Sequence, residues 1–360
     1  MTNSPTVSQT DRESSDYAST TSAAALAQVI RKATRVLLLT HSKPDGDAVG
    51  SVVALRRALE QCGVRADILL MGPIDQALLA VLEGEPVRRL EREGPPPEEP
   101  DLIMLVDTGS WSQVEALRAW LVPRMARIVG VDHHRRGDAI AALRLVDWSC
   151  ASTTQALMPL LKALEVRISA ELATPLFMGL ATDTGWFRFS SADAAVLRLA
   201  SELLGAGAAK DWLFATLEQN ARPSRLSLTA RALASIEFVD PVGGGRIAVM
   251  TLSRDDFAET GGGSEDTGGV VNEPLVIREV RASILLSQHE AGVTRVSFRS
   301  KPDLIAPDGR MLEPGLDVNE LAARFGGGGH VQAAGARIAA ELDEARKTVM
   351  AEIRGKRDRE

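Results

Sequence analysis

Acidic residues and histidines recur along this chain at the points where apolar, strand-like segments end. In a parallel α/β sheet the carboxyl ends of the strands meet at one edge, and ligands bind in the crevice there. We therefore expect these side chains to come together in the folded protein. His41, Asp45 and Asp47 follow the apolar run 35–40, Asp107 follows 102–106, Asp132, His133 and His134 follow 127–131, and Asp183 ends 175–182.

Such a set of side chains favours divalent metal ions. Several carboxylates at one edge repel each other unless cations lie among them, and oxygen ligands with a few imidazoles suit Mn²⁺ or Mg²⁺. Two ions about 3.5–4 Å apart can activate water for in-line attack on phosphorus. Each motif alone has an ordinary explanation, such as a helix N-cap for the D-x-D pair. Their joint occurrence in parallel-sheet order indicates a metal site.

The elements that must position these residues alternate between strands and helices. This alternation predicts an α/β fold with a doubly wound, mainly parallel sheet. The proline-rich stretch 91–100 is expected to be a surface loop. Strands are predicted at 35–41, 65–71, 102–106 and 127–131, and helices at 48–62, 112–121, 152–164, 169–180 and 194–204.

After residue 222 the pattern changes to that of a smaller α+β domain. Strands are predicted at 246–252, 280–287 and 293–298, and helices at 317–324 and 341–353. The predicted organisation is a disordered tail at 1–21, a catalytic metal-binding domain at 22–205, a helical linker at 206–235 and a substrate-binding domain at 236–360.

Composition limits the partners that the protein can hold. The formal net charge of -7 over 360 residues argues against a broad basic surface, so we expect no long nucleic acid to be held stably. Cys62 and Cys150 form no C-x-x-C pair, which excludes a disulfide framework or a cysteine zinc site. With neither a secretory signal nor a membrane span in the sequence, we expect a cytoplasmic protein that contacts no membrane.

The motifs resemble those of a known family. H-S-K-P-D-G-D-A-V-G-S (41–51), V-D-T-G-S (106–110), V-D-H-H (131–134) and A-T-D-T-G-W-F-R (181–188) are similar to the four motifs of the DHH phosphoesterase superfamily. F-R-S (298–300) and F-G-G-G-G-H-V-Q-A-A-G-A (325–336) resemble the DHHA1 domain of its nanoRNase and pAp-phosphatase branch. The resemblance implies a DHH domain followed by a DHHA1 domain, with the active site in the cleft between them.

The resemblance also implies roles for the clustered residues. His41 and Asp45 would hold one manganese ion, Asp47 and His133 a second, Asp107 would bridge them, and Asp183 would complete the cluster. Mn²⁺ is the expected ion, with Mg²⁺ and Co²⁺ as alternatives. Asp132 would orient His133, because a ligating imidazole needs its other nitrogen fixed. His134 would face the scissile phosphate.

In the second domain the expected substrate-binding residues are an arginine and a glycine-rich loop. Arg299 has the fork of donors that suits a phosphate, and the loop would point backbone N–H groups at an anion, followed by a helix. The stretch 302–315 is longer than the turn expected of nanoRNase relatives. Ser152-Thr153-Thr154 is explained by N-capping of a helix. The full predicted set is Arg299, Ser300, Gly327, Gly328, Gly329, His330 and Asn272.

The function implied is hydrolysis of short RNA or DNA oligonucleotides and linear dinucleotides to mononucleotides, and of 3′-phosphoadenosine 5′-phosphate (pAp) to AMP. One alternative is a manganese-dependent inorganic pyrophosphatase or another small phosphoanhydride hydrolase. An alternative of another class is a nucleotide-binding sensor without catalysis, although every expected ligand is present. A homodimer remains open at this point.

Overall fold

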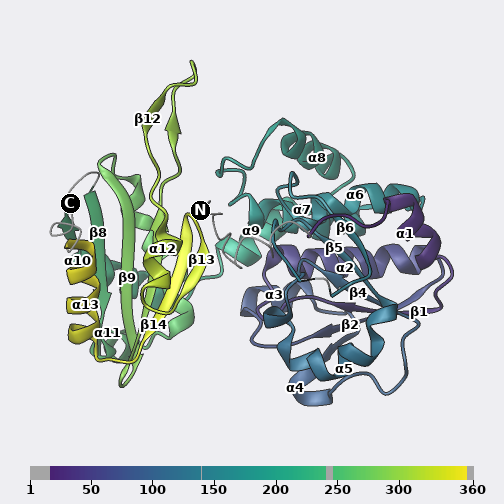
Figure 1. The fold of residues 1–360 in the computed structure, drawn as a ribbon, viewed down its shortest axis with the longest axis horizontal. Helices are drawn as coiled ribbons and strands as arrows, with labels where there is room; N and C mark the ends of the chain where they lie inside the picture. The colour runs from purple at the N-terminus through teal and green to yellow at the C-terminus, as the bar shows by residue number, and fades with distance from the viewer. Residues whose placement is uncertain (1–16, 139, 241–245, 355–360) are drawn as a thin grey trace, which may run out of the picture. The chain divides into compact units, whose positions relative to one another are not determined.

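The computed structural model describes residues 17–138, 140–240 and 246–354, which divide into two compact units at residues 220 and 221. Figure 1 shows the helices and strands of the two units. The division falls inside the stretch 206–235 that we expected to be a helical linker. Of its two helices, α9 (Lys210–Glu218) belongs to the first unit and α10 (Pro223–Ala234) to the second. Leu228 and Ala232 of α10 are buried with Met250 in the core of the second unit, so α10 is part of that unit.

The first unit contains a six-stranded sheet in the order β3-β2-β1-β4-β5-β6, and every neighbouring pair is parallel. The predicted doubly wound sheet is therefore confirmed. The strand order reverses between β1 and β4, and in such sheets the crevice at this reversal is the usual ligand site. The strands are β1 (Arg35–Leu39), β2 (Arg65–Leu70), β3 (Val87–Arg89), β4 (Leu102–Val106), β5 (Ile128–Asp132) and β6 (Leu143–Val146).

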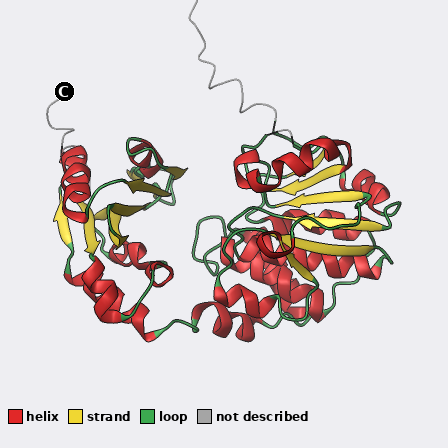
Figure 2. Ribbon diagram, turned by 90° about the horizontal axis from the view of Figure 1, so that it is seen from below, coloured by secondary structure: helices red, strands yellow, loops and turns green. Residues whose placement is uncertain are grey.

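Apolar residues on both faces of this sheet are buried, as is usual for a parallel sheet with covered faces. Leu38 faces the core shared with α2, α6 and α7, whereas Leu37 and Leu39 face the opposite core. Figure 2 shows the helices stacked against the strands. The helices of this unit are α1 (Ala23–Ile30), α2 (Gly46–Gln61), α3 (Gln76–Val81), α4 (Leu90–Glu93), α5 (Arg118–Leu121), α6 (Thr153–Ala163), α7 (Ala170–Asp183), α8 (Ala194–Gly205) and α9.

Glycines let α2 and α7 approach closely, and these two helices carry site residues. A Cβ on Gly50 of α2 would lie 2.4 Å from the carbonyl oxygen of Pro175 in α7. A Cβ on Gly179 of α7 would lie 2.4 Å from Asp47 Oδ1. Any larger residue at either position would push the helices apart, so the glycines set the distance between them.

Three predictions for the first unit were wrong in detail. The helix predicted at 112–121 is broken into 3₁₀ turns, η2 (Trp111–Gln113) and η3 (Glu115–Leu117), before α5. Its apolar spacing still buries Leu117 and Leu121, but the backbone of Val114, with φ of -124°, interrupts the helix. The proline-rich loop begins later than predicted, since residues 90–93 form α4.

The third difference concerns the tail expected at 1–21, of which residues 1–16 lie outside the described residues. Residues 17–21 lie along strand β6 at the edge of the sheet. The backbone N–H of Thr20 donates to the carbonyl of Arg144, and the Ser19 hydroxyl donates to the carbonyl of Val146. Tyr17 is 7% exposed. These residues are thus a packed part of the first unit.

The second unit is an α+β domain whose six-stranded sheet has the order β13-β14-β10-β9-β8-β7. β8 and β9 are parallel, and the other pairs are antiparallel. Its strands are β7 (Glu237–Val239), β8 (Arg246–Leu252), β9 (Val280–Glu290), β10 (Val293–Ser300), β13 (Gly328–His330) and β14 (Ala333–Ile338); its helices are α10, α11 (Arg254–Thr260), α12 (Val318–Ala323) and α13 (Leu342–Arg354), with 3₁₀ turns η5 (Ser264–Thr267) and η6 (Val270–Val276).

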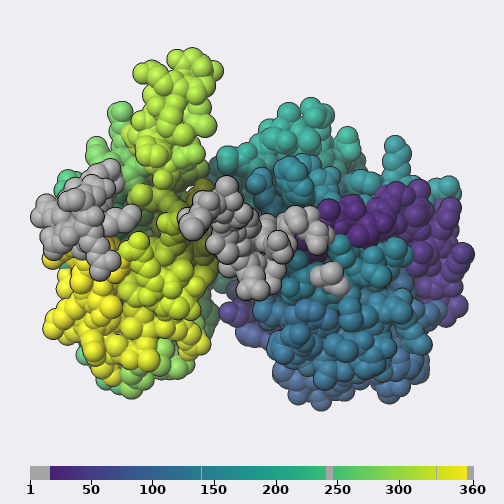
Figure 3. Space-filling view, in the orientation of Figure 1, coloured from purple at the N-terminus to yellow at the C-terminus, as the bar shows by residue number. Residues whose placement is uncertain are grey.

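The extended stretch 302–315 forms a separate two-stranded hairpin, β11 (Leu304–Ile305) and β12 (Met311–Glu313). The hairpin projects from the body of its own domain (Figure 3). Its apolar residues are about half exposed, at 47–55%. Across both units, none of the described helices combines the length and apolarity needed to cross a membrane.

Candidate active site

The site begins at the end of β1, where His41 and Asp45 lie in the loop that leads into α2. Asp45 is the N-cap of α2 and accepts hydrogen bonds from the backbone of Asp47 and Ala48. The capping interpretation of the D-x-D pair is thus correct for Asp45. Both capping hydrogen bonds end on Oδ1, so they do not engage Oδ2. His41 Nε2 lies 3.9 Å from Asp45 Oδ1 and 3.5 Å from Asp107 Oδ2.

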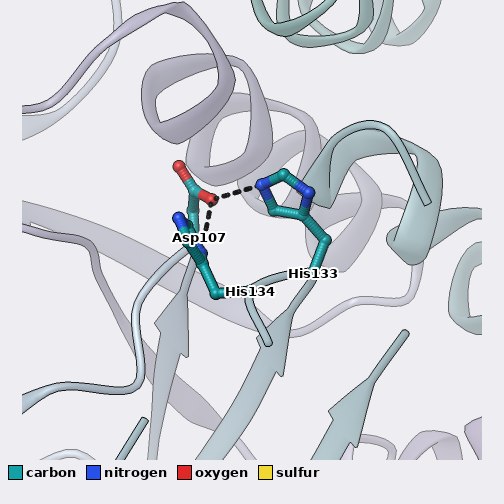
Figure 4. A group of neighbouring side chains, drawn as sticks. All are labelled: Asp107, His133 and His134. Atoms are coloured by element: carbon teal, nitrogen blue, oxygen red, sulfur yellow. Dashed lines mark ion pairs between the residues drawn. The ribbon is translucent and has the colours of Figure 1, made fainter. Parts of the chain in front are cut away.

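Asp107 follows β4, the neighbour of β1 at the reversal of strand order. The residue is 2% exposed, and its carboxylate lies near the imidazoles of His41, His133 and His134. Asp107 Oδ1 is 3.6 Å from His133 Nε2 and 3.8 Å from His134 Nδ1 (Figure 4). The backbone of Asp107 has φ of 59°, a left-handed conformation that is costly for a non-glycine residue and clusters at functional sites.

Asp47, in the first turn of α2, is completely buried and is held by the N-terminus of α6. The backbone N–H groups of Thr153 and Thr154 donate to its two carboxylate oxygens over 2.5 and 3.0 Å. Unpaired N–H groups at a helix N-terminus favour an anion in this way. The Thr153 hydroxyl donates to Asp107 Oδ1 over 2.9 Å. The N-terminus of α6 therefore fixes two carboxylates of the site.

His133 presents one ring nitrogen to the site because the other is engaged. Its Nδ1–H donates to the carbonyl of Cys150 over 3.3 Å, which leaves Nε2 facing the carboxylates. His133 Nε2 lies 3.3 Å from Asp183 Oδ2, at the C-terminal end of α7. Burial lowers the pKa of His133, so the neutral ring that a metal requires is favoured.

Asp132 contacts the imidazole of His134, and our prediction that it orients the His133 ring was wrong. Asp132 Oδ1 accepts from the Nδ1–H of His134 over 2.7 Å and from the backbone N–H of His133 and His134. The ring of His133 is instead held by Cys150. Burial alone would lower the pKa of His134, but the hydrogen bond and charge of Asp132 raise it to about 9.

Three of the clustered carboxylates, Asp47, Asp107 and Asp183, have raised pKa values. Burial, together with the charges of neighbouring carboxylates, raises the pKa of Asp107 well above normal and that of Asp183 to about 10. Burial also raises the pKa of Asp47 to about 6, although hydrogen bonds from the α6 backbone oppose this. A cation among them would reverse this effect, because it favours the ionised form. The donor set therefore fits divalent metal ions.

Ligand atoms from these residues form three overlapping groups within 4.8 Å: His41, Asp45 and Asp107; Asp47, His133 and Asp183; and Asp107, His133 and His134. All predicted metal ligands are thus brought together at one edge of the sheet. Sequence reasoning missed the roles of Thr153 and Thr154, which N-capping had seemed to explain. Their position at a helix start that follows the third acidic motif is the signal that would have indicated them.

In the second unit, Arg299 lies near the end of β10 and is partly buried. Its Nη1 donates to the carbonyl of Phe298, and burial lowers its pKa. Among the described residues no carboxylate is within ion-pair distance of Arg299. Strand register places Arg299, Ala333 and His330 in one row across β10, β14 and β13. The side chain of His330 lies outside the described part.

The glycine-rich loop is not followed by a helix, contrary to our prediction. Gly328–His330 form β13, which turns directly into β14. A Cβ on Gly327 would lie 2.1 Å from the carbonyl oxygen of Gly335, and one on Gly329 2.4 Å from that of Ala333. The glycines therefore permit a close approach between backbones, and a helix N-terminus contributes no positive potential.

Two other predicted substrate-binding residues differ in accessibility. Ser300 is buried, and its hydroxyl donates to the carbonyl of Leu316 over 2.6 Å. This hydrogen bond gives Ser300 a structural role that requires no substrate. Asn272 lies in the 3₁₀ turn η6 with an exposed side chain.

Comparisons with known proteins agree with this architecture. Residues 35–180 match the model of the DHH family N-terminal domain, and residues 244–355 match the DHHA1 domain. The bifunctional oligoribonuclease and PAP phosphatase NrnA of Thermus thermophilus is 33% identical over 322 residues, covering 89% of each chain. The protein of the same name from Bacillus subtilis is 24% identical, covering 84% of this chain and 89% of its own.

Solved structures show the same fold. An exopolyphosphatase-related protein from Bacteroides fragilis superposes with a TM-score of 0.81 at 22% identity, covering 93% of this chain and 95% of its own. RecJ from Thermus thermophilus in complex with Mn²⁺ has a TM-score of 0.50 at 18% identity, covering 92% of this chain and 54% of its own. The two matched domains, in this order, and the extent of the identity show that the chain belongs to the DHH–DHHA1 family of metal-dependent phosphoesterases.

Proposed function

We propose that this protein hydrolyses short oligonucleotides and linear dinucleotides to mononucleotides, and pAp to AMP, with two divalent metal ions. The observation that carries the proposal is the position of Asp107, a buried carboxylate common to two of the three ligand groups at one sheet edge. The relatives named as oligoribonucleases and PAP phosphatases support the substrate class.

The ligand groups suggest how two ions would be held. His41 and Asp45 would hold one, and Asp47, His133 and Asp183 the other, with Asp107 between them. When bound, the ions would stabilise charge on the phosphate and lower the pKa of a water molecule. Mn²⁺ is the ion we propose, because the set mixes carboxylates with imidazoles.

The protein's own groups complete the chemistry. Thr153 holds the Asp107 carboxylate in one orientation through its hydrogen bond. His134 is held by Asp132 with its charged form favoured, so it can stabilise a phosphate or donate a proton to the leaving oxygen from Nε2. Its Nδ1 is already committed to the Asp132 carboxylate, which supports a role for His134 at the phosphate and not as a metal ligand.

Arg299 would bind the part of the substrate that is not cut. Its partly buried guanidinium has five donors in a planar fork and no carboxylate partner among the described residues, which suits a phosphate. A cationic anchor in the second domain would favour substrates with a second phosphate group, as in a dinucleotide or pAp. Selection by length would then follow from the substrate needing both contacts.

A panel of five substrates tests the proposal: pAp, a dinucleotide, a five-mer, a longer RNA and pyrophosphate, each with Mn²⁺. We expect the dinucleotide and pAp to be hydrolysed and the longer RNA to be cut poorly. Pyrophosphate cleavage faster than dinucleotide cleavage would favour the inorganic pyrophosphatase alternative. Binding of dinucleotide without turnover of any of the five would favour the sensor alternative. The presence of all predicted ligands argues for catalysis.

A further inference from the structure

Tyr17, the only tyrosine of the chain, is buried and contacts Asp132, which lies 115 residues away in sequence. Its ring lies between the loops that follow β4 and β5. A Cβ on Gly109 would lie 2.0 Å from its hydroxyl oxygen, and one on Gly137 2.6 Å from its ring. Glycine in both loops therefore makes the space in which the ring sits.

The segment that carries Tyr17 is attached to β6 rather than lying loosely on the surface. The backbone N–H of Thr20 donates to the carbonyl of Arg144, and the backbone N–H of Arg144 donates to the Thr20 hydroxyl. In the same way, the Ser19 hydroxyl donates to the carbonyl of Val146 and accepts from the backbone N–H of Val146. The ring of Tyr17 also lies 5.8 Å from the guanidinium of Arg144. The segment is thus held at β6 by several contacts that do not involve the Tyr17 hydroxyl.

The hydroxyl completes the hydrogen bonding of Asp132. Asp132 is 1% exposed, and its Oδ1 accepts from the backbone and Nδ1 of His134. Its Oδ2 accepts from the Tyr17 hydroxyl over 2.5 Å. With donors on both oxygens, the carboxylate is held in one orientation. Without the hydroxyl, Oδ2 would be a buried acceptor without this donor, and the carboxylate would be held through Oδ1 alone.

We propose that Tyr17 is a positioning residue, which acts through Asp132 to hold the His134 imidazole in its working orientation. Tyr17 then adds a residue of the N-terminal segment to the active-site support. Outer partners of this kind commonly change activity by about 10–100-fold when removed. The inference rests on the proposed hydrolysis of short oligonucleotides and adds a residue to it.

The test uses full-length Tyr17→Phe, which removes only the hydroxyl and keeps the ring. We expect kcat on a dinucleotide to fall about tenfold or more, with KM, bound Mn²⁺ and the melting temperature close to those of the parent. In the His134→Ala background the same substitution should cause no further loss, because the two residues act in series. Ser19→Ala is the matched control, since it removes contacts of the same segment that do not reach Asp132.

A second readout does not depend on turnover. In metal-free protein labelled with ¹⁵N-histidine, the Nδ1 resonance of His134 should shift in Tyr17→Phe and stay in place in Ser19→Ala. Parent-like kcat and an unchanged resonance in Tyr17→Phe would overturn the proposal. The proposal would also be overturned if Ser19→Ala lowered kcat as much as Tyr17→Phe does. It would likewise be overturned if Tyr17→Phe lowered kcat in the His134→Ala background by the same factor as in the parent. A parent that hydrolyses none of the five substrates would reject the proposed function itself, and this inference with it.

Discussion

The Thr153 hydroxyl donates a hydrogen bond to Asp107 Oδ1 over 2.9 Å, joining the N-terminus of α6 to the carboxylate that lies between the ligand groups. The same residue's backbone N–H donates to Asp47. One residue thus fixes two carboxylates on different elements, so its hydroxyl should affect chemistry more than folding.

Replacing Thr153 by valine should lower Mn²⁺ affinity or kcat by about 10–100-fold, because Asp107 loses an orienting donor while the backbone contact to Asp47 remains. Thr153→Ser keeps the hydroxyl and should retain most of the activity. Isothermal titration with Mn²⁺ and dinucleotide kinetics check both variants. If the valine variant and the parent have equal Mn²⁺ affinity and equal kcat, Asp107 does not need the hydrogen bond from the Thr153 hydroxyl.

The two adjacent histidines should separate metal binding from turnover. His134→Ala should retain two bound ions and lose kcat by about 10²–10³-fold, since it loses transition-state stabilisation while the proposed ligands stay. His133→Ala should lose metal, because its Nε2 faces Asp107 and Asp183. Metal analysis of both purified variants decides the assignment, and metal loss in His134→Ala alone would reverse the two roles.

Arg299 should determine KM rather than metal binding. Arg299→Ala is expected to raise KM for dinucleotides and pAp about tenfold or more and to reduce the difference in rate between two-mers and longer RNA. Arg295→Ala is a matched control, because Arg295 lies on the same strand at an exposed position. If Arg299→Ala and His330→Ala both keep the parent KM and length preference, the second domain does not select the substrate.

Gly179→Ala should destabilise the first unit, because its Cβ would overlap Asp47 Oδ1 and the Thr154 side chain. Overpacking of this kind costs about 1–3 kcal/mol. Gly205→Ala, where a Cβ meets no atom within 4 Å, should change the free energy of unfolding little. Urea unfolding monitored by circular dichroism compares the two variants. Equal stability would mean that α2 and α7 can separate without cost.

The sequence was sufficient to predict the parallel sheet and the convergence of its acidic and histidine residues. Short apolar runs mark buried strands, and parallel strands bring their carboxyl ends to one edge. The sequence could not reveal the contact of Tyr17 with Asp132, which depends on where a polar N-terminal segment lies in space. Nor could it show that Asp132 faces His134, because side-chain direction after a strand depends on the local turn. Strand β13 was missed because its residues, Gly328–His330, are mostly glycines and so carry no apolar alternation that would indicate a strand.

Metal-dependent dinucleotide hydrolysis, measured for the parent and for Asp107→Asn, tests the central claim most directly. The substitution keeps the side chain's size and removes its charge, so the two ligand groups lose the carboxylate between them. We predict no hydrolysis by chelated parent, full recovery with added Mn²⁺, and no recovery in Asp107→Asn. Full-rate hydrolysis by the chelated parent, or equal Mn²⁺-dependent rates in both proteins, would contradict the account.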